Sequence, residues 1–465
     1  MADHARRRFL AGLGALAAAP LAARLAAADS GSPGRVAGFG PLEPDGEGLL
    51  DLPAGFHYRI VSRPGDAMDD GFVVPGLADD MHAFAAPGGK CVLVRNHELA
   101  PDSAETAFRA MRGALDAERI ARIYDAGAGR GGVTTAVVDT ASARVEAQYL
   151  TLAGTLRNCS GGATPWGSWI TCEEMVVGVG DFGAQRAHGY NFEVPASARG
   201  LVDPLPLTAM GRFNHEAAVV DARTGVVYQT EDRPDGLLYR FLPSEPGRLA
   251  AGGRLQALAL RGMPGVHTGN RRRGAPRFAP RERHPVEWLD LEEPDSPGDD
   301  LRYQGRSKGA AVLVRCEGMA VETDAGGGAA CVWIVATTGG ASRLGQLWCY
   351  RPSPEEGRAD ERHRPATLEL ALEPRHIEWL ANGDNLTVAP FGDLVVCEDN
   401  DVAQHLVGVT ASGGVYRLAA NARRDSEFAG ATFSPDGATL FVNLQRPGLT
   451  LAIKGPWHTR RDAPD

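Results

Sequence analysis

The chain has 465 residues, and its 58 Gly and 31 Pro together make up about a fifth of them. A hydrophobic share of 43% excludes wholesale disorder, while so many turn-forming residues disfavour a fold dominated by long helices. The formal charge of -10, from 58 acidic against 48 basic residues, makes nucleic acid and anionic membranes poor candidates for the main partner. The length fits two or three average domains or one large β domain.

The first predicted element is an export signal. Three arginines, Arg6 to Arg8, precede an uncharged run of small and apolar residues over 11–23, and a small-residue cleavage pattern follows over 26–28. This order predicts a twin-arginine signal peptide over residues 1–28, with export by the twin-arginine machinery to the periplasm or the medium. The apolar run is too short to cross a hydrocarbon core of about 30 Å, so we expect no permanent membrane anchor. The competing interpretation is the basic, amphipathic N-terminus of a cytosolic protein.

Beyond the signal, one pattern recurs six times. A polar residue opens a short apolar strand, a turn of Gly, Asp or Pro follows, and a second apolar strand ends in a carboxylate or amide. The six units begin near Met81, Asn158, His215, Glu317, Asp384 and Gly430. Repeated units of this kind close into a propeller, so we predict an all-β fold, a single six-bladed β-propeller domain over residues 29–465. The competing interpretations are a β-sandwich and a two-domain protein.

Two stretches interrupt the repeats. Residues 100–125 are rich in Ala, Arg, Glu and Met with helical spacing, which predicts a helix from Ala104 to Tyr124 inserted in the first unit. Residues 262–309 carry several Pro and an acidic run, which favours a long surface excursion.

The cysteine count is odd. Seven cysteines in an exported protein leave at least one thiol unpaired, and such a thiol is either buried and inert or a metal ligand. No two of them have CxxC spacing, which disfavours a zinc ribbon or a redox pair.

The innermost strands of a propeller line one axis, so equivalent positions of all units converge there. The residues expected to meet in this way are Glu98, Cys159, Glu173, Glu216, Glu231, Glu317, Asn385 and Glu398. These carboxylates would repel one another without counter-charge. Because oxygen ligands suit Ca2+ and carboxylates with a thiolate suit a ferric or zinc ion, the pattern predicts a shared metal site. Taken one at a time, each Glu is better explained as an exposed strand end.

Several motifs resemble those of PhoX-type alkaline phosphatases. They are the run Asn158–Trp169 with its extension Cys172–Glu174, then Gly211–Glu216, Arg315–Gly318, Cys397–Asp399, Glu427–Gly430 and the closing segment Phe433–Trp457. The resemblance covers residues from about 40 to 457. It implies a six-bladed propeller, exported by the twin-arginine route, that hydrolyses phosphate monoesters at a centre of two ferric ions and calcium ions bridged by an oxo group.

The resemblance also implies roles for individual residues. Cys159 resembles the cysteine that ligates iron, and Arg315 resembles the arginine that contacts phosphate. The carboxylates expected as metal ligands are Glu216, Glu231, Asp232 and Glu317. The repeat geometry adds Glu98, Glu173 and Glu398 to this set. The cofactors expected from the resemblance are Fe3+ and Ca2+.

The chemistry itself favours a metal-centred reaction. A protein this acidic repels a phosphate dianion unless bound cations reverse the local potential. Monoester hydrolysis needs on the order of 20 kcal/mol of barrier reduction, which several metal ions can supply together. No Ser-His-Asp triad stands out near the motifs.

We therefore expect a monomeric, metal-dependent phosphomonoesterase acting on a small-molecule phosphate monoester. Two other functions fit the same channel: a calcium-dependent propeller hydrolase of another type, such as a lactonase or phosphodiesterase, and a non-catalytic binding propeller with structural calcium.

Overall fold

The computed structural model describes residues 34–464, except 112, 114, 272–276 and 425. The predicted signal peptide, residues 1–28, lies outside the described residues. Within the described part of the chain, no helix is long and apolar enough to cross a membrane. Strands account for nearly all regular structure, which confirms the predicted all-β class.

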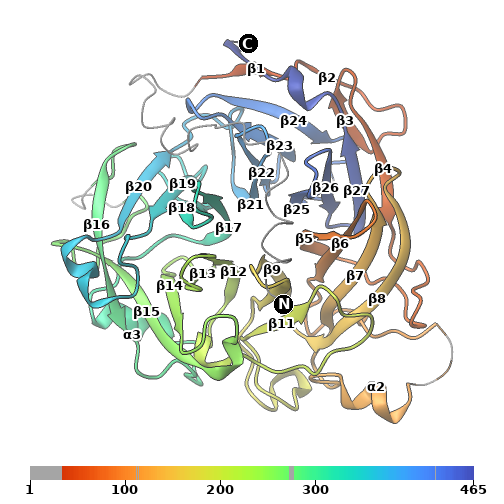
Figure 1. Ribbon diagram of the computed structural model, residues 1–465, viewed down its shortest axis with the longest axis horizontal. Helices are drawn as coiled ribbons and strands as arrows, with labels where there is room; N and C mark the ends of the chain where they lie inside the picture. Colours follow the sequence, from red (N-terminus) through yellow and green to blue (C-terminus); the bar gives the residue numbers. More distant parts are fainter. Residues whose placement is uncertain (1–33, 112, 114, 272–276, 425, 465) are drawn as a thin grey trace, which may run out of the picture.

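Hydrogen-bonded strand order divides most of the chain into six antiparallel units around one axis (Figure 1). In chain order their strands are β5 (Ala78–Ala86), β6 (Lys90–His97), β7 (Gly131–Asp139) and β8 (Arg144–Thr155); β9 (Asn158–Ala163), β10 (Ser168–Glu173) and β11 (Asn191–Pro195); β12 (His215–Val220), β13 (Val227–Glu231), β14 (Leu238–Pro243) and β15 (Gly253–Leu260); β17 (Cys316–Thr323), β18 (Ala329–Ala336), β19 (Gln346–Arg351) and β20 (Thr367–Leu372); β21 (Gly383–Val388), β22 (Leu394–Glu398), β23 (His405–Val409) and β24 (Val415–Asn421); and β25 (Phe428–Phe433), β26 (Thr439–Leu444) and β27 (Leu449–Lys454) with β4 (His57–Ser62).

The first strands of the six units form a closed ring. In the order β5, β9, β12, β17, β21 and β25, each strand contacts the next, and β25 contacts β5 again. This is the arrangement of a β-propeller, with the first strand of each unit lining the axis (Figure 1). An additional strand, β16 (Arg283–Asp290), pairs with both β15 and β20, so the third and fourth units share one continuous sheet.

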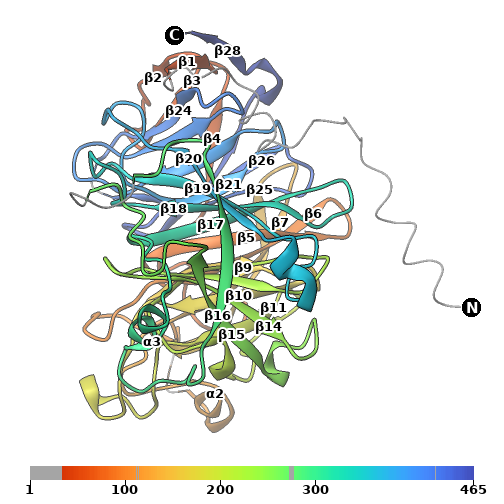
Figure 2. The same ribbon diagram turned by 90° about the vertical axis from the view of Figure 1, so that its left-hand side faces the viewer.

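Segments from the two ends of the chain close the ring. Strand β4 pairs with β27 and completes the last unit, which otherwise consists of C-terminal strands. Strand β3 (Leu50–Pro53) pairs with β24 and carries β2 (Leu42–Glu43) at its edge. At the rim, β1 (Val36–Gly38) pairs with β28 (Arg461–Pro464), as Figure 2 shows. Unfolding either end therefore exposes an edge of the propeller.

Among the described residues, six of the eight clusters of buried apolar side chains lie between neighbouring units, one at each interface. Successive residues of a strand face opposite sides of its sheet, so each unit is buried on both faces. In β13, for example, Val227 packs toward the second unit and Tyr228 toward the fourth. Large fully buried rings such as Trp333 and Trp348 hold these interfaces together.

The helix predicted over Ala104–Tyr124 is largely wrong, because among the described residues of this segment only α2 (Ala117–Ala121) is helical. Upstream of it, the Ala107 N–H donates to the Arg130 carbonyl at 2.7 Å. The backbone of this segment thus finds its partner outside the segment, and tertiary contacts override the local helical spacing.

The predicted excursion over 262–309 is partly regular, because it contains β16 and α3 (Leu301–Ser307). Short 3-10 turns lie at Asp181–Gly183, Thr208–Met210, Leu249–Ala251, Ala359–His363 and Trp457–Thr459.

The cysteines divide into one pair and a buried free set. Cys331 and Cys349 form a disulfide between β18 and β19. Cys159 is among five cysteines that are free and buried, which confirms the prediction of an unpaired thiol.

Candidate metal centre

Each of the six innermost strands begins with a potential metal ligand. In five of them it is the second residue of the strand, and in β25 it is the residue just before the strand. These six residues, which we call the inner ring, are Asp79, Cys159, Glu216, Glu317, Asp384 and Glu427. Because the strands surround one axis, the fold gathers the six side chains at one end of the channel.

A second set of polar residues lies beside the inner ring. In each unit it is the residue immediately after the second strand, and four of the six are carboxylates. We call these residues the strand-end set: Glu98, Glu174, Asp232, Thr337, Asp399 and Gln445.

A repeated backbone hydrogen bond fixes the two sets against each other. The N–H of a strand-end residue donates to the carbonyl that lies two residues before the inner-ring residue of the same unit. The bonds are 2.9 Å for Glu98 to Leu77, 3.0 Å for Glu174 to Arg157, 3.3 Å for Asp232 to Asn214, 2.9 Å for Thr337 to Arg315 and 2.9 Å for Asp399 to Asn382.

Four of these accepting residues have a left-handed backbone. The φ angles are 46° at Leu77, 43° at Arg157, 47° at Arg315 and 51° at Asn382. A non-glycine residue in this region costs about 1–2 kcal/mol, so the surrounding structure must hold each bend in place. The bend turns the chain into the inner strand and presents the next-but-one side chain to the axis.

The ligand atoms approach one another in three overlapping groups. These groups are Asp79 with Glu98 and Cys159, Cys159 with Glu174 and Glu216, and Glu216 with Glu317 and Asp384, each with its ligand atoms within 4.8 Å of one another. Two residues, Cys159 and Glu216, are shared between groups, so the groups form a continuous chain of possible ligands.

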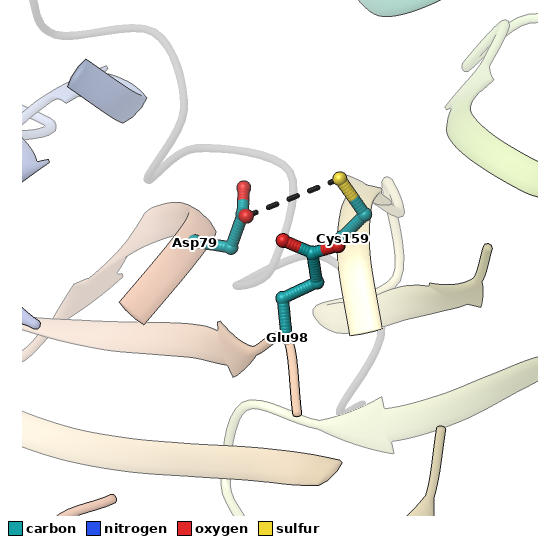
Figure 3. A group of neighbouring side chains, drawn as sticks. All are labelled: Asp79, Glu98 and Cys159. Carbon is teal, nitrogen blue, oxygen red and sulfur yellow. Dashed lines mark hydrogen bonds between the residues drawn. The ribbon is translucent and has the colours of Figure 1, made fainter. Parts of the chain in front are cut away.

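Cys159 lies at the junction of this chain. Its Sγ is 3.4 Å from Glu216 Oε1 and 3.9 Å from Asp79 Oδ2. Figure 3 shows the thiol facing Asp79, with the Glu98 carboxylate directed toward the same space. Gln445 Nε2 donates to Asp79 Oδ2 at 2.9 Å and to Glu98 Oε2 at 2.8 Å, which holds two of the carboxylates in position.

Burial and mutual repulsion make these groups costly to ionise. Desolvation, followed by the charge of neighbouring carboxylates, raises the pKa of Asp79, Glu216 and Glu317 well above the ordinary value. The same causes raise the pKa of the Cys159 thiol. A bound cation would reverse this effect, because it favours the ionised form of every ligand.

Two oxygens of the site are left without partners. Within the described part of the chain, Asp79 Oδ1 and Glu216 Oε2 are buried and accept no hydrogen bond. Buried polar atoms are nearly always paired, so an unpaired carboxylate oxygen calls for a ligand. The donor set therefore fits bound cations.

Two arginines offset part of the negative charge. Arg315 Nε and Nη2 donate to Asp232 at 2.8 and 2.7 Å, and Nη2 also donates to Glu317 at 2.8 Å. Arg157 lies 2.5 Å from Glu98 Oε1 and 2.7 Å from Glu174 Oε2. Neither arginine is fully buried, since the side chains keep 35% and 39% of their exposure for Arg157 and Arg315.

Three of the predicted ligands, Glu173, Glu231 and Glu398, form other contacts. Each is the last residue of its second strand, one position before the strand-end set, so its side chain faces the opposite side of the sheet. Glu231 accepts from the Tyr239 hydroxyl at 2.8 Å and the Leu237 N–H at 3.2 Å.

The other two glutamates hold the bends that precede the inner strands. Glu173 Oε1 accepts from the Leu156 N–H at 2.9 Å, and Glu398 Oε1 accepts from the Ala381 N–H at 2.8 Å. Each also lies beside a buried histidine, His188 at 2.6 Å for Glu173 and His405 at 2.8 Å for Glu398. The position of these glutamates supports a structural role.

The structure brings together the remaining predicted residues: Glu98, Cys159, Glu216, Asp232, Arg315 and Glu317. It adds members that sequence reasoning missed, namely Asp79, Glu174, Asp384, Asp399 and Glu427. Asn385, expected at the axis, instead accepts from the Gly430 N–H at 2.7 Å through Oδ1.

Beyond the inner ring, the channel continues as a cavity of about 390 Å³ with both polar and apolar walls. Residues from all six innermost strands line it, among them Met81, Ala163, Val219, Met319, Leu386 and Ala431. The lining also includes Asp80 and His82, so polar groups extend along this side of the channel.

A family model described as alkaline phosphatase PhoX matches residues 37–448. The chain belongs to this family. The match covers nearly the whole propeller and confirms the resemblance carried by the motifs around Cys159 and Arg315. No match was found among curated protein sequences.

One solved structure shows the same fold, and two others are less similar. PhoX of Pseudomonas fluorescens, in complex with the transition-state analogue vanadate, is 16% identical, with 92% of this chain and 98% of that chain covered and a TM-score of 0.62. A gluconolactonase of Xanthomonas campestris is 12% identical over 92% of this chain and 97% of that chain, with a TM-score of 0.38. The periplasmic gluconolactonase of Pseudomonas aeruginosa is 14% identical over 84% and 90%, with a TM-score of 0.39.

Proposed function

We propose that this protein is an exported, monomeric phosphatase that uses Fe3+ and Ca2+ at the inner ring to hydrolyse small phosphate monoesters. The observation that carries the proposal is that Cys159 and Glu216 link three overlapping groups of potential ligands. The third group contains Glu317, which Arg315 contacts. Membership of the PhoX family supports the same reaction.

The ligand types suggest how the cations are distributed. We assign ferric ions to the two groups that contain the Cys159 thiolate, because carboxylates with a thiolate suit a ferric ion. We assign Ca2+ to the all-carboxylate group of Glu216, Glu317 and Asp384. Bound cations supply Lewis-acid polarisation of phosphoryl oxygens and offset the carboxylate charge.

The protein's own groups orient the substrate. Asp232 and Glu317 hold the Arg315 guanidinium from one side, through Nε and Nη2. Within the described chain Nη1 has no hydrogen bond, and the side chain is 39% exposed, so Nη1 is free to donate to a phosphoryl oxygen. A guanidinium fixed in this way needs little reorganisation when charge shifts in the transition state.

One set of measurements on purified protein tests the proposal. We expect iron and calcium in the isolated protein, and turnover of p-nitrophenyl phosphate that is lost in Glu216→Gln together with metal. Glu146→Gln, which alters an exposed ion pair with Lys90, is the matched control and should retain both. Full turnover by Glu216→Gln, or a metal-free active wild type, would contradict the proposed site.

The remaining parts of the proposal have separate tests. Export with removal of residues 1–28 predicts a secreted or periplasmic product whose sequence begins near Asp29. Substituting the Arg6–Arg7 pair with Lys should retain the protein in the cytoplasm. Light scattering should give the mass of one chain, and a stable dimer would contradict the monomer.

A further inference from the structure

Arg157 occupies the same structural position as Arg315 in another unit. Each lies two residues before an inner-ring residue, Cys159 or Glu317, and each has a left-handed backbone, with φ of 43° and 47°. Each carbonyl accepts the N–H of the strand-end residue of its own unit. The two guanidinium groups thus enter the site from equivalent bends.

The contacts of the two side chains also correspond. Arg157 Nε donates to Glu98 Oε1 at 2.8 Å, and its Nη2 lies 2.7 Å from Glu174 Oε2. Arg315 uses the same two nitrogens for Asp232 and Glu317. In both arginines Nη1 makes no hydrogen bond to any described residue, and it is not among the buried unpaired atoms. Both therefore keep one donor that is not buried and has no partner among the described residues.

The two arginines flank one arc of the site. Arg157 lies 2.7 Å from Glu174, and Arg315 holds Asp232 in a bidentate pair. Glu174 and Asp232 are neighbours, since burial and then nearby charges, including that of Asp232, raise the pKa of Glu174. A ligand seated above these two carboxylates and their cations therefore has one guanidinium on either side.

We propose that Arg157 is a second phosphate-binding residue, which with Arg315 holds a dianionic phosphoryl group and favours monoesters over diesters. This inference rests on the proposed function and specifies its substrate class. A monoester dianion offers three terminal oxygens and two charges, so both guanidinium groups find an anionic acceptor. A diester has one charge and a second ester group in place of one acceptor, so one arginine loses its partner.

The competing explanation is that Arg157 only neutralises Glu98 and Glu174. A lysine at this position keeps the positive charge but loses the planar fork, in which one edge binds carboxylates while Nη1 faces the ligand. Arg157→Lys therefore separates the two explanations. Arg122→Lys, at an exposed ion pair with Glu118, is the matched control.

The test uses the metal-loaded protein and inorganic phosphate as the probe. We expect calorimetry to show phosphate binding about ten- to hundredfold weaker in Arg157→Lys, with iron and calcium contents unchanged and Arg122→Lys like wild type. The ratio of kcat/KM for p-nitrophenyl phosphate over bis(p-nitrophenyl) phosphate should also fall.

Three results would overturn the inference: wild-type phosphate affinity in Arg157→Lys, an unchanged monoester-to-diester ratio, or loss of metal from this variant, which would show that Arg157 acts through the ligands. Failure of the proposed function would give a different set of results. In that case wild type turns over neither ester, while calorimetry still reports whether Arg157 binds phosphate.

Discussion

Removal of the metal ions should make the stability of the fold depend steeply on pH. Five buried carboxyls, those of Asp79, Glu174, Glu216, Glu317 and Asp384, have pKa values raised well above the ordinary 3.8 of Asp and 4.5 of Glu, first by burial and then by like charges. In the metal-free protein, the folded state therefore binds more protons than the unfolded chain at pH values above about 4.5. The free energy of unfolding must then fall as the pH rises toward the raised pKa values.

The size of this effect follows from the number of protons. Each carboxyl that is protonated in the folded state and ionised in the unfolded chain lowers the free energy of unfolding by about 1.4 kcal/mol per pH unit. Neighbouring carboxyls titrate in steps, so we take about two at any one pH, which gives about 3 kcal/mol per unit. Between pH 5 and 7 the loss is about 6 kcal/mol, comparable to the whole stability of a typical domain.

Urea unfolding, followed by circular dichroism, measures this slope. We expect the protein stripped with calcium and iron chelators to lose stability from pH 5 to 8, while the metal-loaded protein changes much less. Asp384→Asn removes one titrating group and should flatten the slope of the stripped protein, whereas Glu146→Gln at the surface should not. A stripped protein with pH-independent stability, metal loss having been confirmed, would refute the reasoning.

Four substitutions test individual residues in and beside the site. Arg315→Lys loses the bidentate contact with Asp232. It should lower kcat/KM without metal loss, by an amount equal to about 2–4 kcal/mol of transition-state stabilisation. Wild-type kinetics in this variant would exclude Arg315 from substrate binding. Cys159→Ser should lose iron and any thiolate-to-iron absorption while keeping the circular dichroism spectrum of a β-sheet protein. An unchanged iron content would show that the thiol only fills space in the core. Glu174→Gln should lower the metal content. Glu173→Gln should chiefly lower the free energy of unfolding, by about 2 kcal/mol, and so lower Tm. Identical effects would contradict the assignment of Glu174 to the axis and Glu173 to a structural role.

The propeller was predictable because the local sequence pattern of each unit identifies it. Two apolar strands with a Gly, Asp or Pro turn between them recur six times, and each unit can be identified without reference to the others. The closure of the ring was not predictable in this way. Strand β4 pairs with β27, nearly 400 residues away, through a register of which Tyr58 and Ile453 are one pair. No local pattern in either strand identifies that partner.

The prediction of a long helix in the first unit was wrong for a related reason. Helical spacing in the segment before Asp116 is a weak preference, and it competes with contacts from distant parts of the chain. The Ala107 N–H, which a helix would have satisfied internally, donates to Arg130 instead. Within the part of this segment that the structure describes, only the short stretch after Asp116, whose side chain caps the Arg119 N–H, is helical.

The carboxylates at the unit ends were predicted from the sequence, but not which of two neighbouring carboxylates faces the axis. Two adjacent carboxylates end the second strand in three units: Glu173-Glu174, Glu231-Asp232 and Glu398-Asp399. A strand places neighbours on opposite faces, so only one member of each pair can face the axis, and composition cannot say which. In the structure, the first member of each pair accepts hydrogen bonds from a neighbouring backbone N–H, and the second member faces the axis.

This division explains why both members of a pair are acidic although only one faces the axis. In the second unit, Glu173 accepts from the Leu156 N–H and so holds the chain just before Arg157, whose left-handed bend leads into Cys159. Glu174, one residue later, reaches the same bend from the axis through its ion pair with Arg157. The bend thus has a carboxylate on each side. A slip of one residue in β10 in one direction would put Met175 in the place of Glu174 and remove a carboxylate from the axis. A slip in the other direction would put Cys172 in the place of Glu173 and leave the Leu156 N–H without its acceptor. Register and ligand geometry are therefore held by the same pair of side chains.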